Sequence, residues 1–166
     1  ASLEEGELSA LLDELDRLVR LAGTQSPYVS LLSEIAPVIQ DEELALRVLM
    51  RAANTARDQL QRPDEARVYF ERVLALRSDH GPALDALERL HEQSGDYRSL
   101  LAIVGQKTDL AGDVATRTRL LMRQAELSAE RLDDVPRAIE AYERLLDEAP
   151  SAAVFAGIEP LYARAE

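Results

Sequence analysis

One seven-residue stretch decides the fold of this chain: Leu12-Asp13-Glu14-Leu15-Asp16-Arg17-Leu18, which returns further along as Leu84-Asp85-Ala86-Leu87-Glu88-Arg89-Leu90. The two copies lie about 72 residues apart, and we call this spacing the repeat length. It also places residues 47–53 (Arg-Val-Leu-Met-Arg-Ala-Ala) on residues 119–125 (Arg-Leu-Leu-Met-Arg-Gln-Ala). Matches in separate blocks at one spacing are hard to obtain by chance, so the sequence contains an internal duplication.

Within each copy the apolar residues recur every three or four positions, which is the spacing of amphipathic helices. No segment alternates apolar and polar residues with the β-branched enrichment of a strand. The sequence therefore predicts an all-α protein. The expected helices cover residues 7–22, 26–39, 41–61, 64–77, 80–94, 96–111, 113–132, 135–148 and 151–165.

Residues suited to starting or ending a helix lie between these segments. Glycine takes the left-handed conformation that ends a helix, proline is tolerated in a first turn, and Asp or Ser accepts the unpaired N–H groups there. We expect these roles for three glycines (Gly23, Gly95, Gly112), four prolines (Pro27, Pro63, Pro82, Pro136) and five caps (Asp41, Asp64, Asp79, Asp113, Ser151).

Each copy thus holds four helices, or two antiparallel hairpins. A hairpin cannot bury its apolar stripe alone, so we expect the hairpins to stack into an α-solenoid. The chain begins with Ala1 and its last helix lacks a polar ending, so we expect a piece of a longer protein. The prediction is a single repeat domain over residues 1–166, with hairpins at 7–39, 41–77, 80–111 and 113–148 and a terminal helix at 151–165.

Several residues resemble the tetratricopeptide repeat (TPR), a helix-turn-helix unit of about 34 residues. In that family the second helix opens with Ala, has an aromatic residue four positions later, and is followed by Pro. Ala138, Tyr142 and Pro150 fit this pattern, and Ala66 and Phe70 fit its first two positions. The resemblance implies a right-handed superhelix, whose first helices line a concave face, and a role in protein–protein interaction.

Other positions both support and depart from this resemblance. Gly95-Asp96-Tyr97 resembles the family's turn between helices, and the first helices place a large apolar residue before Leu or Ile, as in Leu84 with Leu87 and Phe155 with Ile158. The second helices at 26–39 and 96–111 lack the Ala–aromatic pair. The small residue usual after the Leu of the first helix is also replaced in every hairpin, by Asp16, Asn54, Glu88 and Glu126.

Composition narrows the classes of function. A formal net charge of −12 opposes binding to phosphate backbones, so we expect no nucleic-acid partner. Cysteine is absent, which excludes disulfides and thiolate sites. No apolar run approaches the roughly 18 residues of a membrane span, and no signal peptide is seen. We therefore expect no membrane insertion; the compartment stays open, with the cytoplasm slightly favoured.

No residue pattern indicates catalysis, a cofactor or a metal. His80 lies in a turn where a capping role suffices, and His91 takes a packing position of a first helix. A metal site needs converging ligands, which two separate histidines do not supply. Glu126 and Glu130 are one helical turn apart, but nothing places a second catalytic group opposite them. We expect a protein that is not an enzyme and binds no cofactor.

The candidate site is a ladder of arginines, one in each hairpin. Their paired N–H donors match carboxylate oxygens, so the ladder is a candidate for capturing the acidic side chains or the C-terminus of a peptide. The alternative is helix support, because Asp13–Arg17 and Asp85–Arg89 are i,i+4 pairs in the favourable orientation. By resemblance to the family, the residues facing the concave side include Arg17, Arg51, Arg89, Arg123, Asp13, Asp58, Asp85 and Glu130.

The sequence thus predicts a non-catalytic protein–protein interaction scaffold that binds a peptide or protein partner through its concave face. Two alternatives stay open. One is a regulatory or linker segment of a larger enzyme such as a kinase. The other is a self-assembly module in which solenoid ends stack between chains to form a homo-oligomer.

Overall fold

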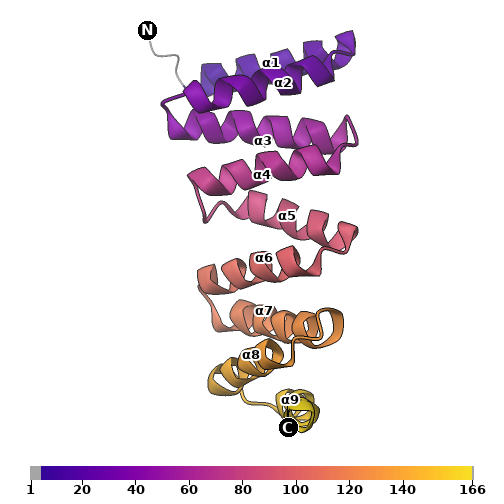
Figure 1. Ribbon diagram of the computed structural model, residues 1–166. Coiled ribbons are helices and arrows are strands. Elements are labelled where there is room, and N and C mark those ends of the chain that lie inside the picture. Colours follow the sequence, from indigo (N-terminus) through magenta and orange to yellow (C-terminus); the bar gives the residue numbers. More distant parts are fainter. Residues whose placement is uncertain (1–4, 166) are drawn as a thin grey trace. The chain divides into compact units, whose positions relative to one another are not determined.

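A computed structural model describes residues 5–165 of the chain (Figure 1). Side chains are described for residue 10 and for residues 12–165. Helices and their turns make up this part of the chain, and no strand occurs in it. The all-α class is therefore confirmed. The α-helices are α1 (Glu5–Ala22), α2 (Gln25–Ile35), α3 (Glu42–Asp58), α4 (Pro63–Leu76), α5 (Gly81–Ser94), α6 (Tyr97–Leu110), α7 (Val114–Glu126), α8 (Val135–Glu148) and α9 (Ala152–Ala165).

The chain forms two compact units, Ala1–Ala83 and Leu84–Glu166, and we describe each by itself. In the first unit α1 packs on α2, α2 on α3, and α3 on α4. In the second unit α6 packs on α7, α7 on α8, and α8 on α9. These pairs of helices, consecutive in sequence, are therefore neighbours in space within their unit. The expected single domain over residues 1–166 stays a prediction.

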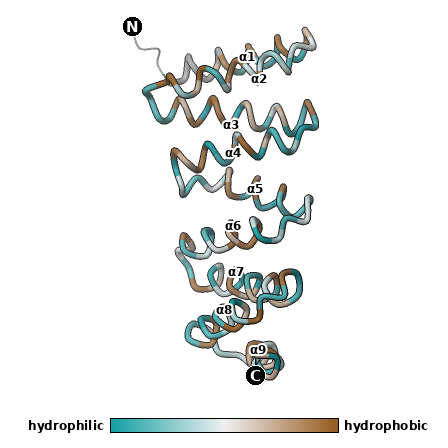
Figure 2. Tube along the Cα trace, in the orientation of Figure 1, coloured by the Kyte–Doolittle hydropathy of each residue, from teal (hydrophilic) through white to brown (hydrophobic). Residues whose placement is uncertain are grey.

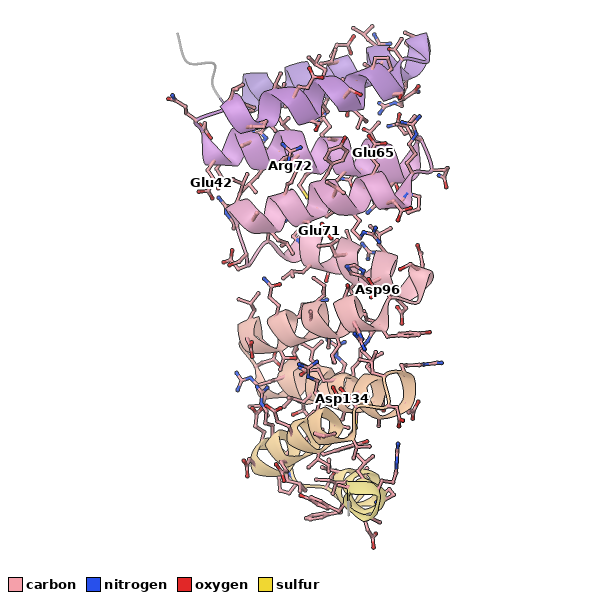
Figure 3. All side chains as sticks on the ribbon, viewed as in Figure 1. Glu42, Glu65, Glu71, Arg72, Asp96 and Asp134 are labelled. Carbon is pink, nitrogen blue, oxygen red and sulfur yellow. The ribbon has the colours of Figure 1, made fainter. Side chains whose placement is uncertain are left out.

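Aspartates at the helix starts accept backbone N–H groups and so fix where the helices begin. Asp41 and Asp113 each accept the N–H three residues further on, at 3.0 and 2.8 Å. Asp96 and Asp134, both labelled in Figure 3, do the same for α6 and α8 at 3.2 Å. Ser151 accepts the N–H of Val154 at 3.4 Å. Side-chain acceptors here replace the intrahelical partners that the first N–H groups lack.

Three of the boundary predictions are wrong. Asp79 does not cap α5, because that helix begins at Gly81 and it is His80, the residue just before it, that accepts the N–H of Ala83. Asp64 does not cap a helix, because α4 begins at Pro63 and Asp64 lies within its first turn. Gly112 does not take a left-handed conformation, because α6 already ends in the extended residue Ala111. The chain leaves this helix without needing a residue of positive φ.

The duplication extends to the backbone conformation. Gly23 and Gly95 have φ angles of 67° and 70°, and they lie one repeat length apart. Gln61 and Asp133, also one repeat length apart, have φ angles of 54° and 52°. A residue with a Cβ is strained in this left-handed region, so the repetition of such rare conformations shows that the two copies fold alike.

The core of each unit contains the aromatic residue that the family resemblance singled out. Phe70 is fully buried in the first unit, and Tyr142 is 8 % exposed at the same position of the second. Ala66 and Ala138, one turn earlier, are also fully buried. Figure 2 shows hydrophobic positions recurring along each helix instead of collecting in one of them. Small and large residues thus interlock where second helices meet first helices.

One packing expectation is wrong, because Phe155 lies on the exposed side of α9. Its side chain is 57 % exposed, whereas Val154, Ile158 and Leu161 are 2–4 % exposed. These three residues recur at helical spacing and form the face that packs on α8. Phe155 follows Val154 by one residue, or about 100° of rotation, and therefore points away from this face.

The two long first helices end differently. The helix α3 keeps α-helical hydrogen bonds to Asp58, whereas α7 continues beyond Glu126 as a π-helical turn, Leu127–Arg131. A π turn holds one extra residue per turn and is frequent at functional sites. It places Glu130 and Arg131 at the end of the second unit's first-helix surface.

Removing the cap of α7 is expected to produce a pH-dependent loss of stability. Hydrogen bonds from the Thr116 backbone N–H and hydroxyl lower the pKa of Asp113 below its ordinary value of 3.8. A lowered folded-state pKa stabilises the protein above the unfolded pKa, and this contribution disappears as pH falls through the folded value. Urea unfolding should show Asp113→Ala less stable than the natural chain at neutral pH, with the gap narrowing below pH 3.8.

The matched control is Asp113→Asn, which keeps the acceptor oxygen but cannot titrate. Its stability should change less with pH across the acidic range than that of the natural chain. A gap between Asp113→Ala and the natural chain that stays constant down to low pH would contradict the prediction.

Candidate functional site

A polar groove of about 320 Å³ follows α3 in the first unit. Asp16 of α1 forms one side, and Arg51, Asn54 and Asp58 of α3 form the other. The α3 side chains are three or four positions apart, so they share one helix face. Two residues of the predicted site, Arg51 and Asp58, therefore lie in one groove.

A matching groove of about 310 Å³ follows α7 in the second unit. Its lining includes Arg123, Glu126 and Glu130, which lie one repeat length after Arg51, Asn54 and Asp58. The remaining lining comes from Glu92 of α5, from Tyr97 of α6 and from the π turn. The same surface of the first helix is thus hollowed in both copies of the duplication.

Arg51 joins two first helices. Its guanidinium donates to Asp16 at 2.6 Å and to Asp13 at 2.7 Å, both of them on α1. The side chains of Arg51 and Asp16 are only 19 % and 18 % exposed, so this pair is partly shielded from water. Burial alone would lower the pKa of Arg51, but the hydrogen bond to Asp13 and the charge of Asp16 hold it above its usual value.

Arg123 makes the corresponding pair in the second unit. It lies 2.8 Å from Glu88 and 2.9 Å from Glu92, both on α5. Glu88 also binds Lys107 of α6 at 2.5 Å, so one carboxylate of 12 % exposure serves two cations. Asp85 completes the cluster by binding Lys107 at 2.5 Å.

The four arginines of the predicted ladder therefore differ in their partners. Arg51 and Arg123 are held by carboxylates of a neighbouring helix, whereas Arg17 pairs within α1 with Glu14 at 2.6 Å. Arg89 is exposed and has no ion-pair partner among the side chains that the structure describes. The expected i,i+4 pairs are not formed, because Asp13 binds Arg51 and Asp85 binds Lys107 instead.

The other predicted site residues keep local contacts. Asp58 pairs with its neighbour Arg57 at 2.7 Å, and that hydrogen bond lowers the pKa of Asp58. Glu130 and Glu126 lie near Tyr142, whose pKa is raised first by burial and then by these two charges. The second-unit groove is accordingly more acidic than the first.

The four departures from the family pattern turn out to mark this site. Asp16 and Glu88 anchor the arginine pairs, and Asn54 and Glu126 line the two grooves. From the sequence these residues stand out only as exceptions to the family pattern, yet they are the feature of the sequence that indicates where the arginine pairs and the grooves lie. A charged residue where the family has a small one faces the adjacent first helix and can pair across to it. Lys107, on a second helix, had no comparable signal.

Neither histidine forms part of a site. His80 Nδ1 accepts the backbone N–H of Ala83 at 3.2 Å, which is the expected turn role. His91 is 4 % exposed, and its Nδ1 lies 3.5 Å from Asp96. Across the described residues, no group of three His, Asp or Glu side chains is arranged to hold a metal ion. None of the helices described combines the length and apolar content needed to cross a membrane.

Antiparallel helix hairpins that recur with the sequence duplication define a helical repeat protein. Within this class, the sequence model of the tetratricopeptide repeat matches residues 119–152, which run from α7 to the start of α9. The chain is a TPR-like repeat protein. The matched segment contains Ala138, Tyr142 and Pro150, the residues on which the resemblance was strongest.

A solved structure shares the fold. The N-terminal domain of stress-induced protein-1 (STI-1) from C. elegans superposes with a TM-score of 0.51 at 12 % sequence identity. The alignment covers 75 % of this chain and 99 % of that domain. At this identity the likeness concerns the fold alone. No curated protein sequence matches the chain.

Proposed function

We propose that the chain is a non-catalytic scaffold that binds a protein partner along the first helices of its hairpins. TPR repeats are typically non-catalytic scaffolds for protein–protein interaction, which supports the general role. The observation that carries the finer proposal is the repeated groove, because α3 and α7 present the same positions at the same surface in both units.

The proposed contacts are polar. In the first unit they are Arg51, Asn54 and Asp58, and in the second Arg123 and Glu130. Because the two arginines already bind carboxylates, the grooves have no surplus of positive charge for an acidic ligand. An amide such as Asn54 both donates and accepts hydrogen bonds. The grooves therefore suit the main chain and mixed polar side chains of an extended segment more than a purely acidic one.

The remaining ladder residues are proposed as flanking contacts. Among the four arginines of the ladder, Arg89 is the one without an ion pair to any described side chain, so its N–H donors are available for a partner's carboxylate. Asp13, Arg17 and Asp85 each have one partner and remain more than half exposed as side chains. They can exchange these surface pairs for contacts with a ligand at small cost.

A photo-crosslinking experiment tests the proposal. A benzophenone amino acid replaces Asn54 in one variant and Glu126 in another, and both are irradiated in lysate of the source organism. Matched controls carry it at exposed positions of second helices, Glu71 and Asp147. We expect the groove positions to capture the same partner and the control positions to capture it at least tenfold less.

Other outcomes would count against this function. Equal capture from the control positions would place the binding surface elsewhere. Capture of only a second copy of the chain would favour self-assembly, which light scattering at several concentrations would show as a mass that grows with concentration. Circular dichroism of each variant checks that the helical content is unchanged.

A further inference from the structure

A different groove, of about 290 Å³, lies in the second unit between the second helices α6 and α8. Its apolar lining includes Leu101 and Ala141, which are 5 % and 4 % exposed. Arg98, Arg137 and Arg144 also line it, and Glu140 is the acid among the lining residues. Three cations and one anion thus surround a small apolar floor in a chain whose formal net charge is −12.

The arginines of this groove have few partners within the chain. Arg98 and Arg137 are exposed, and neither guanidinium forms an ion pair or hydrogen bond with any described residue. Arg144 has only Asp109, at 3.7 Å, with both side chains exposed to solvent. Three guanidiniums therefore line one groove with almost all their donors available.

Two of them lie where a cation does not help the helix. Arg98 and Arg137 are in the first turns of α6 and α8, and neither first turn contains an acidic residue. The positive end of the helix dipole favours anions and disfavours cations there. In the first unit the corresponding helix α4 follows the usual preference, with Asp64 and Glu65 in its first turn. The arginines are thus not explained by helix stability.

The corresponding surface of the first unit is filled and neutralised. Tyr69 stands where the second unit has Ala141, and its hydroxyl donates to Glu65 at 3.0 Å. Arg72, the counterpart of Arg144, donates to Ser33 at 2.9 Å and 3.2 Å. Glu65 and Arg72 are labelled on α4 in Figure 3.

Four substitutions between the copies open the groove in the second unit and make it positive. Ala replaces Tyr69 and Gly replaces Ser33, which removes the ring and the acceptor that hold the surface closed. Arg replaces Ser26 and Glu65, which adds two unpaired cations. A fifth difference, Glu140 in place of Val68, adds one acid, so the lining changes from one arginine with one acid to three arginines with one acid.

We infer that the groove between α6 and α8 binds a short acidic segment of a protein partner through its carboxylates. Planar guanidiniums bind carboxylates with paired hydrogen bonds. The rest of the chain is acidic, so the attraction is local to this groove, and two or three adjacent carboxylates suit its small volume. The inference concerns second helices and does not rest on the grooves along α3 and α7.

The test uses an acetylated and amidated tetraglutamate peptide, with tetraglutamine as the neutral control. Backbone amide chemical shifts of the isotope-labelled chain are followed during titration at physiological salt, where long-range repulsion is screened. We expect saturable shifts along α6 and α8 with tetraglutamate and none with tetraglutamine. The double variant Arg98→Ser with Arg137→Glu, which restores the residues of the first unit, should bind tetraglutamate at least tenfold more weakly.

Two controls separate the groove from general charge and from folding. Arg20→Ser with Arg119→Glu makes the same change in net charge at two exposed arginines outside the groove, and it should bind as the natural chain does. Ala141→Tyr with Gly105→Ser fills the groove without changing charge and should also weaken binding at least tenfold. The thermal midpoint of the arginine variant should not fall, because an acid in the first turn of α8 suits the helix dipole.

Several results would overturn the inference. They are the absence of saturable shifts with tetraglutamate, an equal loss of binding in the two arginine variants, and unchanged binding in the filled variant. Inorganic phosphate binding as tightly as tetraglutamate at equal ionic strength would indicate a general anion site instead of a peptide site. A dimer that the groove variant dissociates would assign the groove to a second copy of the chain.

Discussion

Gly157→Ala is expected to lower the free energy of unfolding of the second unit by about 1–3 kcal/mol. A Cβ added at Gly157 would lie 2.6 Å from both Cζ and the hydroxyl oxygen of Tyr142. Tyr142 is 8 % exposed and belongs to the core cluster that Val154 and Leu145 complete, so the ring has little room to move. Ala normally stabilises a helix interior by about 1 kcal/mol over Gly; here the overlap with the ring outweighs that gain.

The matched control is Gly105→Ala in α6, where an added Cβ meets no atom within 4 Å. This change should raise stability by up to about 1 kcal/mol, because only the helix propensity changes. Urea unfolding of both variants measures the two effects, which should have opposite signs. Hydrogen exchange should further show that Gly157→Ala loosens α9 before the rest of the unit.

A rescue experiment identifies the cause. In a Tyr142→Leu background the ring is gone, so the further change Gly157→Ala should cost less than in the natural chain. If the two changes are additive, contact with Tyr142 does not explain the glycine. Retained stability in Gly157→Ala alone would show that α9 adjusts its position freely on α8.

Most of the helices could be predicted from the sequence because their determinants are local. Asp41 and Asp113 supply acceptors at helix starts, and Gly23 and Gly95 supply the left-handed residues that separate helices. The duplication strengthened each of these inferences, since a signal in one copy could be checked in the other. Phe155 could not be placed correctly, because its exposure depends on which face α9 turns toward α8.

The arginine pairs could not be predicted because they depend on contacts between helices. Sequence spacing paired Asp13 with Arg17, but Asp13 binds Arg51 across two first helices. The groove between α6 and α8 was missed for a related reason. Its signal lies in differences between the copies, such as Glu65 against Arg137, whereas an internal duplication is recognised from the residues that match. In a duplicated protein, matching residues indicate the fold, and differing residues indicate where one copy has acquired its own function.

The last prediction concerns Glu88, whose change to Gln is expected to destabilise the second unit by about 1–3 kcal/mol. The carboxylate is 12 % exposed and binds Lys107 at 2.5 Å and Arg123 at 2.8 Å. Gln has nearly the same size, but its NH2 group would face a cation. Because Gln is neutral, Lys107 would keep only Asp85 and Arg123 only Glu92 as a carboxylate partner. Removing one shielded member of such a cluster lowers the free energy of unfolding more than removing an exposed ion pair does.

The control for this change is Glu92→Gln in the same cluster. Glu92 also binds Arg123, at 2.9 Å, but its side chain is 58 % exposed, so its loss should cost only about 0–1 kcal/mol. The first unit offers the same contrast, since Asp16 and Asp13 both bind Arg51 but are 18 % and 69 % exposed. Urea unfolding should therefore give Glu88→Gln a lower free energy of unfolding than Glu92→Gln. It should likewise give Asp16→Asn a lower value than Asp13→Asn.

The Lys107 side chain gives a second measurement. Burial acts to lower its pKa, but the hydrogen bonds that it donates to Asp85 and Glu88 raise the pKa above its usual value. Glu88→Gln removes one of these causes and should lower the pKa of Lys107, which a titration of its side-chain NMR signal would show. An unchanged Lys107 pKa together with equal costs for Glu88→Gln and Glu92→Gln would mean that the cluster behaves as ordinary surface ion pairs. The arginine that it holds would then be as free to meet a ligand as Arg89 is.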